Sequence, residues 1–162
     1  MTAKYKVITP VKDSLATTVE TIRSISRSEG AFDYLIFDDF SSRETADYLD
    51  KDAVSSGYQV IHLRDHVTSP SPNYRTTLIM AQKKALEEKV DLIIVESDVI
   101  VAPETLNGLH DFARSLDQPG LVGSVTTDAQ GTINFPYLHI KQDDPEVLLT
   151  KRSLSFCCTL IT

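Results

Sequence analysis

The stretch "IIVESDVIVAPETL", from Ile93 to Leu106, places acidic side chains between two apolar runs. A charge inside a continuous apolar segment is costly unless it lies at the end of that segment or meets a partner. We therefore predict that a buried strand ends before Glu96 and that the acids lie in the turn after it. Because Pro103 suits the first position of a helix, we expect the turn to lead into one.

Short apolar runs alternate with amphipathic stretches along most of the chain. The predicted strands cover residues 5–9, 34–37, 58–63, 91–95, 121–125 and 153–162. Helical periodicity follows the first four of them near 15–25, 43–53, 74–85 and 103–116. Nearly unbroken apolar strands separated by helices are typical of a largely parallel sheet that is covered on both faces. We predict one α/β domain over residues 1–162, a three-layer sandwich around a mainly parallel, mixed sheet.

The composition is that of a globular domain. The 162 residues are 41% hydrophobic and 24% charged, which argues against disorder. A net charge of −7 without any Lys/Arg cluster excludes a broad nucleic-acid-binding face. Neither a membrane span nor a signal peptide is visible, so we expect a cytoplasmic protein, at most peripheral to the inner face of the membrane.

Polar residues follow three of the predicted strands. Thr9 and Pro10 end the first, Asp38 and Asp39 the second, and the acidic turn after residue 95 the fourth. In parallel sheets the carboxyl ends of the strands share one edge, where ligands gather. Two acidic turns side by side repel each other unless a cation or a hydrogen-bond donor arrives. Carboxylate oxygens suit Mg²⁺ or Mn²⁺, and such a metal lets an acidic protein bind a diphosphate.

Three stretches carry a family resemblance: "VITPVKD", "YLIFDDFSS" and "DLIIVESDVIVAPETL". In order and spacing they resemble the leading motifs of family 2 glycosyltransferases, which use nucleotide sugars and have the GT-A fold. The chain departs from the family pattern at several positions: Asp13 replaces the usual Asn, Phe40 replaces Gly, Glu96 replaces Asp, and Val99 stands where a further acid often follows. The resemblance implies a hexosyltransferase-type enzyme, of the kind found in polysaccharide biosynthesis.

The resemblance also implies roles for the residues that would bind the nucleotide sugar. Pro10 and Val11 would make backbone contacts to the base or ribose, and Asp39 would accept the ring N–H of uracil. Asp38 either contacts the nucleotide or only supports the turn. Arg75 either meets the diphosphate from the start of its helix or is a solvated side chain.

The acidic turn would hold the metal. Asp98 is expected to bind Mg²⁺ or Mn²⁺ directly, and Glu96 to act on the ribose or on the metal through water. The donor would be a UDP-sugar and the acceptor a carbohydrate or another hydroxyl compound. Inverting members of the family draw their general base from a second half that this sequence does not reach, so the catalytic residue stays unassigned and we expect a part of a longer enzyme.

Two other functions remain open from the sequence. A signalling receiver domain is also doubly wound and gathers acids around Mg²⁺, but it needs an acidic pair after the first strand, where this chain has Thr9 and Pro10. A catalytically inactive GT-A-like module that serves protein interaction is the third possibility.

Overall fold

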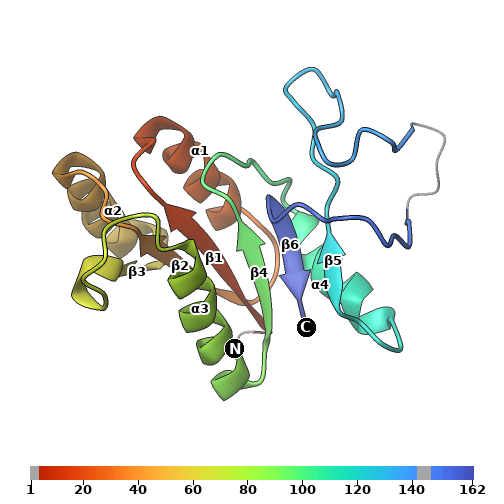
Figure 1. Cartoon of the computed structure of the whole chain (residues 1–162), viewed down its shortest axis with the longest axis horizontal. Helices are drawn as coiled ribbons and strands as arrows, with labels where there is room; N and C mark the ends of the chain where they lie inside the picture. The colour runs from red at the N-terminus through yellow and green to blue at the C-terminus, as the bar shows by residue number, and fades with distance from the viewer. Residues whose placement is uncertain (1–3, 142–146) are drawn as a thin grey trace.

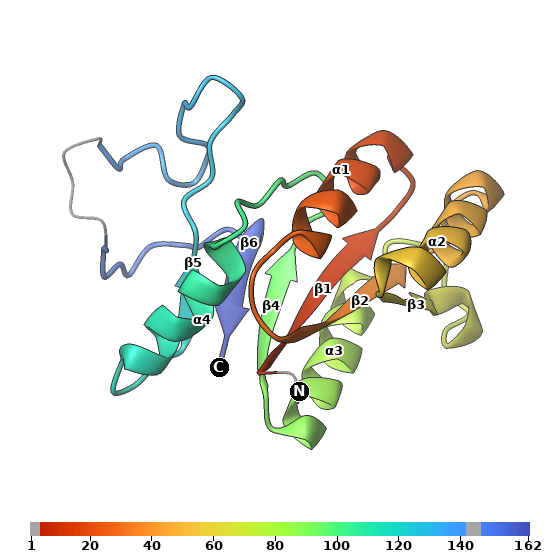
Figure 2. The ribbon, with the colours of Figure 1, turned by 180° about the vertical axis from the view of Figure 1, so that it is seen from behind.

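A computed structural model describes residues 4–141 and 147–162. One six-stranded sheet forms the middle layer, with helices on both faces (Figures 1 and 2). In chain order the elements are β1 (Tyr5–Val11), α1 (Leu15–Ser26), β2 (Phe32–Asp38), α2 (Arg43–Ser56), β3 (Gln59–His62), the 3-10 helix η1 (Leu63–Asp65), α3 (Tyr74–Glu88), β4 (Asp91–Val95), α4 (Thr105–Ser115), β5 (Leu121–Gly123) and β6 (Cys158–Ile161).

The strand order is β3-β2-β1-β4-β6-β5. The strands β1 to β4 are parallel to one another, and β6 runs antiparallel to both β4 and β5. The predicted three-layer fold with a mainly parallel, mixed sheet is confirmed. Receiver-type folds have the order 2-1-3-4-5, so the sheet contradicts the receiver alternative.

Each strand sends alternate side chains into two separate cores, as the two-residue period of a strand requires. Val7 and Ile93 enter the core formed with α1, α2 and α4, which lie together in front of the sheet in Figure 2. Ile8 and Ile94 enter the core formed with α3, on the face shown in Figure 1. Both faces are therefore covered, which explains why the central strands are apolar throughout.

The second half of the chain is less regular than the first. Strand β5 ends at Gly123, two residues earlier than predicted, and β6 occupies only Cys158–Ile161 of the apolar C-terminal run. Local hydrogen bonds explain the shorter β6, because the backbone oxygen of Ser155 accepts the Thr159 hydroxyl at 2.6 Å and turns the chain there. None of the helices in the described ranges is long and apolar enough to cross a membrane.

The strand order reverses between β1 and β4, because β2 and β3 extend the sheet to one side and β6 and β5 to the other. Pairing of β1 with β4 stops at Ile8 and Ile94, whereas pairing with β2 continues to Val11. The carboxyl ends of β1 and β4 are therefore not joined. Ligands of open α/β sheets bind at such a reversal point.

His62, the last residue of β3, lies between two carboxylates. Its Nδ1 is 2.7 Å from Oδ2 of Asp38, and its Nε2 is 2.9 Å from Oδ1 of Asp50. Burial lowers the pKa of His62, but the hydrogen bonds and charges of the two aspartates raise it more, so the pKa lies above the ordinary value of 6.5. The imidazolium form donates to both carboxylates and so joins β3 to the end of β2 and to α2.

We expect this contact to make stability depend on pH. Because the folded-state pKa of His62 is raised, its stabilisation is complete below about pH 6.5 and is lost as the pH rises through the higher folded-state pKa. The free energy of unfolding should fall by about 1 kcal/mol more in the native protein than in His62→Gln over that rise. Urea unfolding at pH 6 and pH 8.5 measures the difference, and His66→Gln, an exposed histidine, is the control. Equal pH dependence in His62→Gln and the native protein would contradict a stabilising role for the contacts of His62 with Asp38 and Asp50.

Candidate functional site

Three turns and the start of α3 meet at the carboxyl edge of the sheet. The turns follow β1, β2 and β4, and the arrowheads of β1 and β4 point to this edge in Figure 1. The described residues that follow β5, from 124 to 141, extend beyond the same edge (Figures 1 and 2). This arrangement brings the acidic turns predicted from the sequence to one rim of the molecule.

Asp39 follows β2 and is held by the segment that leads into α3. Its Oδ2 accepts hydrogen bonds from the Ser71 hydroxyl and the Asn73 backbone N–H, both at 2.7 Å, and its Oδ1 accepts from Nδ2 of Asn73 at 2.8 Å. The backbone N–H of Asp39 donates to the carbonyl of Val11 at 2.8 Å, which ties the turn to the end of β1. The position of the carboxylate is therefore set before any ligand binds.

Asp39 stays ionised in this environment. Burial raises its pKa, but the hydrogen bonds from Asn73 and Ser71 lower it more, and the net pKa lies below the ordinary value. An ionised carboxylate offers roughly four acceptor positions, of which the chain uses three. One position on Oδ1 remains for an incoming donor, although only 8% of the residue is exposed.

Glu96, directly after β4, is held by Tyr74, the residue that follows Asn73 at the start of α3. The hydroxyl of Tyr74 donates to its Oε1 at 2.7 Å, and the backbone N–H of Glu96 donates to the carbonyl of Cys157 at 3.0 Å. Burial and the nearby charge of Asp98 raise the pKa of Glu96, while the hydrogen bond from Tyr74 opposes the rise. A cation between the two carboxylates would relieve this repulsion.

Asn73 and Tyr74 are neighbours in sequence, and each binds one of the two acidic turns. Asn73 holds Asp39 and Tyr74 holds Glu96, so the first turn of α3 sets how these carboxylates lie relative to each other. We call this pair the α3 brace. Sequence reasoning missed it, because an Asn-Tyr pair at a helix start has no pattern that would reveal contacts with two distant turns.

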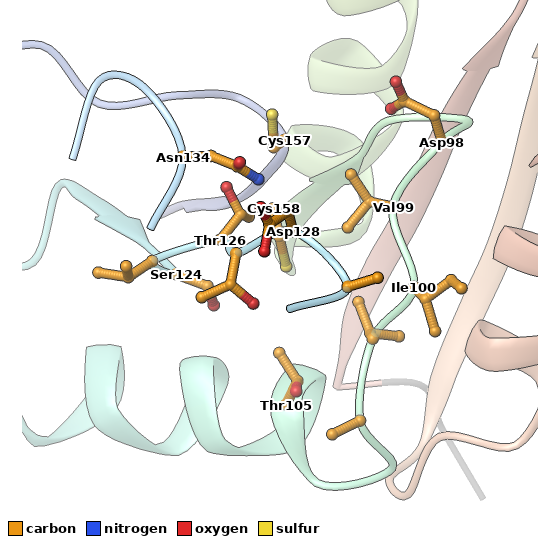
Figure 3. Close-up of a pocket in the computed structure, with 15 residues that line it drawn as sticks. Asp98, Val99, Ile100, Thr105, Ser124, Thr126, Asp128, Asn134, Cys157 and Cys158 are labelled. Atoms are coloured by element: carbon orange, nitrogen blue, oxygen red, sulfur yellow. The ribbon is translucent and has the colours of Figure 1, made fainter. Parts of the chain in front are cut away.

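Asp98 is the exposed acid of the site. It forms no hydrogen bond or ion pair with the described residues, and it borders a cavity that continues along the loop after β4 (Figure 3). No group of three or more His, Cys, Asp or Glu side chains among the described residues is placed to hold a metal by itself. Mg²⁺, however, commonly takes one or two carboxylates and completes its coordination with water and substrate phosphates, and Asp98 with Glu96 fits that pattern.

Of the two roles expected for Asp38, contact with the nucleotide or support of the turn, its contacts in the structure fit support of the turn. Its side chain is fully buried: Oδ1 accepts the backbone N–H of Ser41 at 3.0 Å, and Oδ2 faces His62. Buried carboxylates must be hydrogen-bonded, and these contacts commit Asp38 to the turn. It therefore supports the turn that positions Asp39.

The other predicted nucleotide contacts lie around the opening between β1 and β4. Pro10 is half-buried, and Val11 buries its side chain in the core while its carbonyl bonds to Asp39. Both lie beyond the last pair between β1 and β4. Arg75 is exposed in the first turn of α3 and makes no hydrogen bond or ion pair within the described ranges.

Lys12 and Asp13, which the sequence reasoning did not assign to ligand binding, join the first two turns. The Nζ of Lys12 donates to the carbonyl of Phe40 at 2.6 Å and to the carboxylate of Asp13 at 2.9 Å. Asp13 in turn accepts the backbone N–H of Ser42 at 2.7 Å, and these contacts lower its pKa to about 2. The positively charged side chain of Lys12 lies at the rim of the site. Its position directly after the first strand is the sequence feature that could have identified it as a site residue.

Phe40 explains one departure from the family pattern. It has a φ of 58°, in the left-handed region that glycine adopts without strain. A positive φ at this position is thus a requirement of the turn, which glycine meets without strain. Here Phe40 adopts the same conformation, and packing of its ring against the core beneath α3 offsets the cost.

No protein-family model and no curated protein matches the chain, but solved structures do. S. aureus TarS aligns with a TM-score of 0.56 and 22% identity over 69% of this chain and 20% of that chain. The mannosyltransferase PcManGT from Pyrobaculum calidifontis, in complex with GDP-Man and Mn²⁺, aligns with a TM-score of 0.58 and 17% identity over 78% of this chain and 36% of that chain.

A third match is glucosyl-3-phosphoglycerate synthase from Mycobacterium tuberculosis, in complex with Mn²⁺, UDP and glucosyl-3-phosphoglycerate. It aligns with a TM-score of 0.57 and 16% identity over 79% of this chain and 46% of that chain. The chain thus spans less than half the length of each of these proteins. The likeness confirms the GT-A-like fold that the sequence motifs implied: this chain has the mixed α/β fold of these proteins.

Proposed function

We propose that the chain is the donor-binding domain of a metal-dependent glycosyltransferase. It would transfer a sugar from a nucleoside diphosphate sugar, specifically a UDP-sugar, to a hydroxyl of a carbohydrate or similar acceptor, on the cytoplasmic side of the cell. The observation that carries the proposal is the α3 brace, which holds Asp39 and Glu96 at the strand-reversal edge beside the exposed Asp98. The solved structures support it, because two similar proteins were captured with Mn²⁺ and a nucleotide or nucleotide sugar.

The geometry suits a nucleotide that spans the edge from β2 to β4. The open acceptor position of Asp39 would accept a hydrogen bond from the ring N–H of uracil. Adenine has no ring N–H at the corresponding position. The open end of β1 at Pro10 and Val11 would lie against the base or ribose. Lys12 at the rim and Arg75 at the start of α3 would supply positive charge toward the diphosphate.

The acidic turn would lie at the reacting end of the donor. Asp98 and Glu96 would hold Mg²⁺ or Mn²⁺, and a bound cation supplies neutralisation of the leaving diphosphate. In the transfer the acceptor oxygen attacks the anomeric carbon, the bond from that carbon to the diphosphate oxygen breaks, and a base removes the hydroxyl proton. This chain's contribution is to bind and orient the donor, and no described residue is assigned as the base.

Asp98→Asn tests the metal site. The substitution keeps the size of the side chain and removes its charge, so the affinity for UDP in the presence of Mn²⁺ should fall at least about tenfold. Metal-free UDP binding should not change. Calorimetric titration of UDP with and without Mn²⁺ measures both affinities, and Asp117→Asn, an exposed acid beyond α4, is the matched control. UDP affinity in the native protein that is the same with and without Mn²⁺ would overturn the proposed function.

Tyr74→Phe tests the α3 brace. Loss of the hydroxyl removes the hydrogen bond that orients Glu96, so the Mn²⁺-dependent part of the UDP affinity should fall by about tenfold, while metal-free UDP affinity is kept. Tyr48→Phe is the control, because Tyr48 is also half-buried and its hydroxyl makes no hydrogen bond with the described chain. An equal loss with and without Mn²⁺ would show that Tyr74 only maintains the fold.

A further inference from the structure

A cavity of about 700 Å³ lies on the side of Asp98 that faces β6 and β5, away from Asp39. Three segments form its wall: the loop after β4 with the start of α4, residues 124–129 with Asn134, and Cys157 with Cys158. Figure 3 shows Asp98 at one rim, with Thr126, Asp128 and Asn134 across from it. Small-molecule sites occupy roughly 300–1,000 Å³, so the volume suits a ligand.

The wall contains several neutral polar side chains without a hydrogen-bond partner among the described residues. The side chains of Thr105, Thr126 and Asn134 make no hydrogen bond with the described residues. Thr105 lies at the start of α4, and Thr126 and Asn134 lie in the segment after β5. The hydroxyl oxygen of Thr126 is moreover buried. A buried hydroxyl without a partner is unfavourable, and a ligand hydroxyl in the cavity that Thr126 lines would satisfy it.

The charges on the wall are all negative. Asp98 and Asp128 contribute carboxylates, and no Lys, Arg or His is among the described lining residues. Backbone N–H groups of Thr132, Gln130 and Gly131 bond to Asp128 and lower its pKa, so this carboxylate is ionised. Asp98 would hold the metal of the proposed function, but Asp128 would still repel an anionic ligand, and the described lining offers no cationic side chain to compensate.

We propose that this cavity binds a neutral, polyhydroxylated sugar ring and discriminates against uronic acids and phosphorylated sugars. The proposal rests on the proposed function, because Asp98 is shared between the cavity and the metal site and so places the ring beside the diphosphate. Hydroxyls and the amide supply the hydrogen bonds, and Val99 and Val101 supply apolar surface for the ring. The ring belongs either to the donor or to an acceptor saccharide.

Two titration arms separate these sources. In the first, UDP, UDP-glucose and UDP-glucuronate are titrated into the full chain with Mn²⁺. In the second, methyl glycosides of glucose, galactose, mannose, N-acetylglucosamine and glucuronic acid are titrated with and without UDP, and NMR shifts of the Val99 and Val101 methyls report occupancy. If the ring belongs to the donor, UDP-glucose binds more tightly than UDP, and UDP-glucuronate about tenfold more weakly than UDP-glucose. If it belongs to the acceptor, a neutral glycoside shifts the cavity methyls and the glucuronide does not.

Thr126→Val removes the cavity hydroxyl at nearly constant volume. It should weaken binding of the neutral ring about three- to tenfold and leave UDP affinity unchanged. Thr21→Val is the matched control, because Thr21 on α1 carries another buried hydroxyl without a partner but does not line the cavity. Asp128→Asn should raise the affinity for the glucuronide ligands and leave that for neutral ones unchanged.

The outcomes are distinct from those for the proposed function. Failure of UDP to bind overturns that function, whereas the glycoside arm without UDP still tests the cavity. Equal or tighter binding of the glucuronides, or no cavity shift with any neutral glycoside together with equal affinity for UDP and UDP-glucose, overturns the neutral-sugar proposal. An equal effect of Thr126→Val and Thr21→Val overturns the assignment of Thr126.

Discussion

Repulsion between carboxylates at one edge of the sheet is the constraint on which the site depends. A fold that gathers Asp38, Asp39, Glu96 and Asp98 at neighbouring strand ends must give each charge a donor, a cation or access to water. The structure uses three solutions. His62 and a backbone N–H face Asp38, the start of α3 supplies donors to Asp39 and Glu96, and Asp98 is exposed to solvent.

These solutions divide the acids by role. Asp38 is buried and structural, and Asp39 is ionised and held with one acceptor position open. The charge of Asp98 contributes to the raised pKa of Glu96, so these two have the most to gain from a cation. Because Asn73 and Tyr74 are adjacent on one helix turn, a displacement of α3 would move the contacts of Asp39 and Glu96 together. In the proposed function, Asp39, which would bind the uracil, and Glu96, which would help to hold the metal, are therefore mechanically linked through α3.

The turns that build the site carry conformational cost. Asp13, Ser14 and Phe40 all have φ values between 50° and 58°, a region that non-glycine residues rarely adopt. Each lies in a turn after β1 or β2. The contacts between the two turns, from Asp13 to Ser42 and from Lys12 to the carbonyl of Phe40, hold the strained backbone in place. Such strain at the carboxyl edge, beside ordinary helices, is typical of a binding site.

Hydrophobic periodicity and strand-end chemistry are local, so the sequence alone predicts the layered α/β fold, the first four strands to within a few residues, and the edge that carries the acids. It does not predict which carboxylate serves only the turn, because Asp38 and Asp39 are both buried and differ only in the residues that face them. Tertiary structure decided that His62 meets one and Asn73 the other, that Tyr74 holds Glu96, and that residues 124–134 close a cavity beside Asp98. The three hydrogen bonds among these contacts join residues 22 to 34 positions apart in the sequence. No local pattern encodes a partner at such a sequence separation.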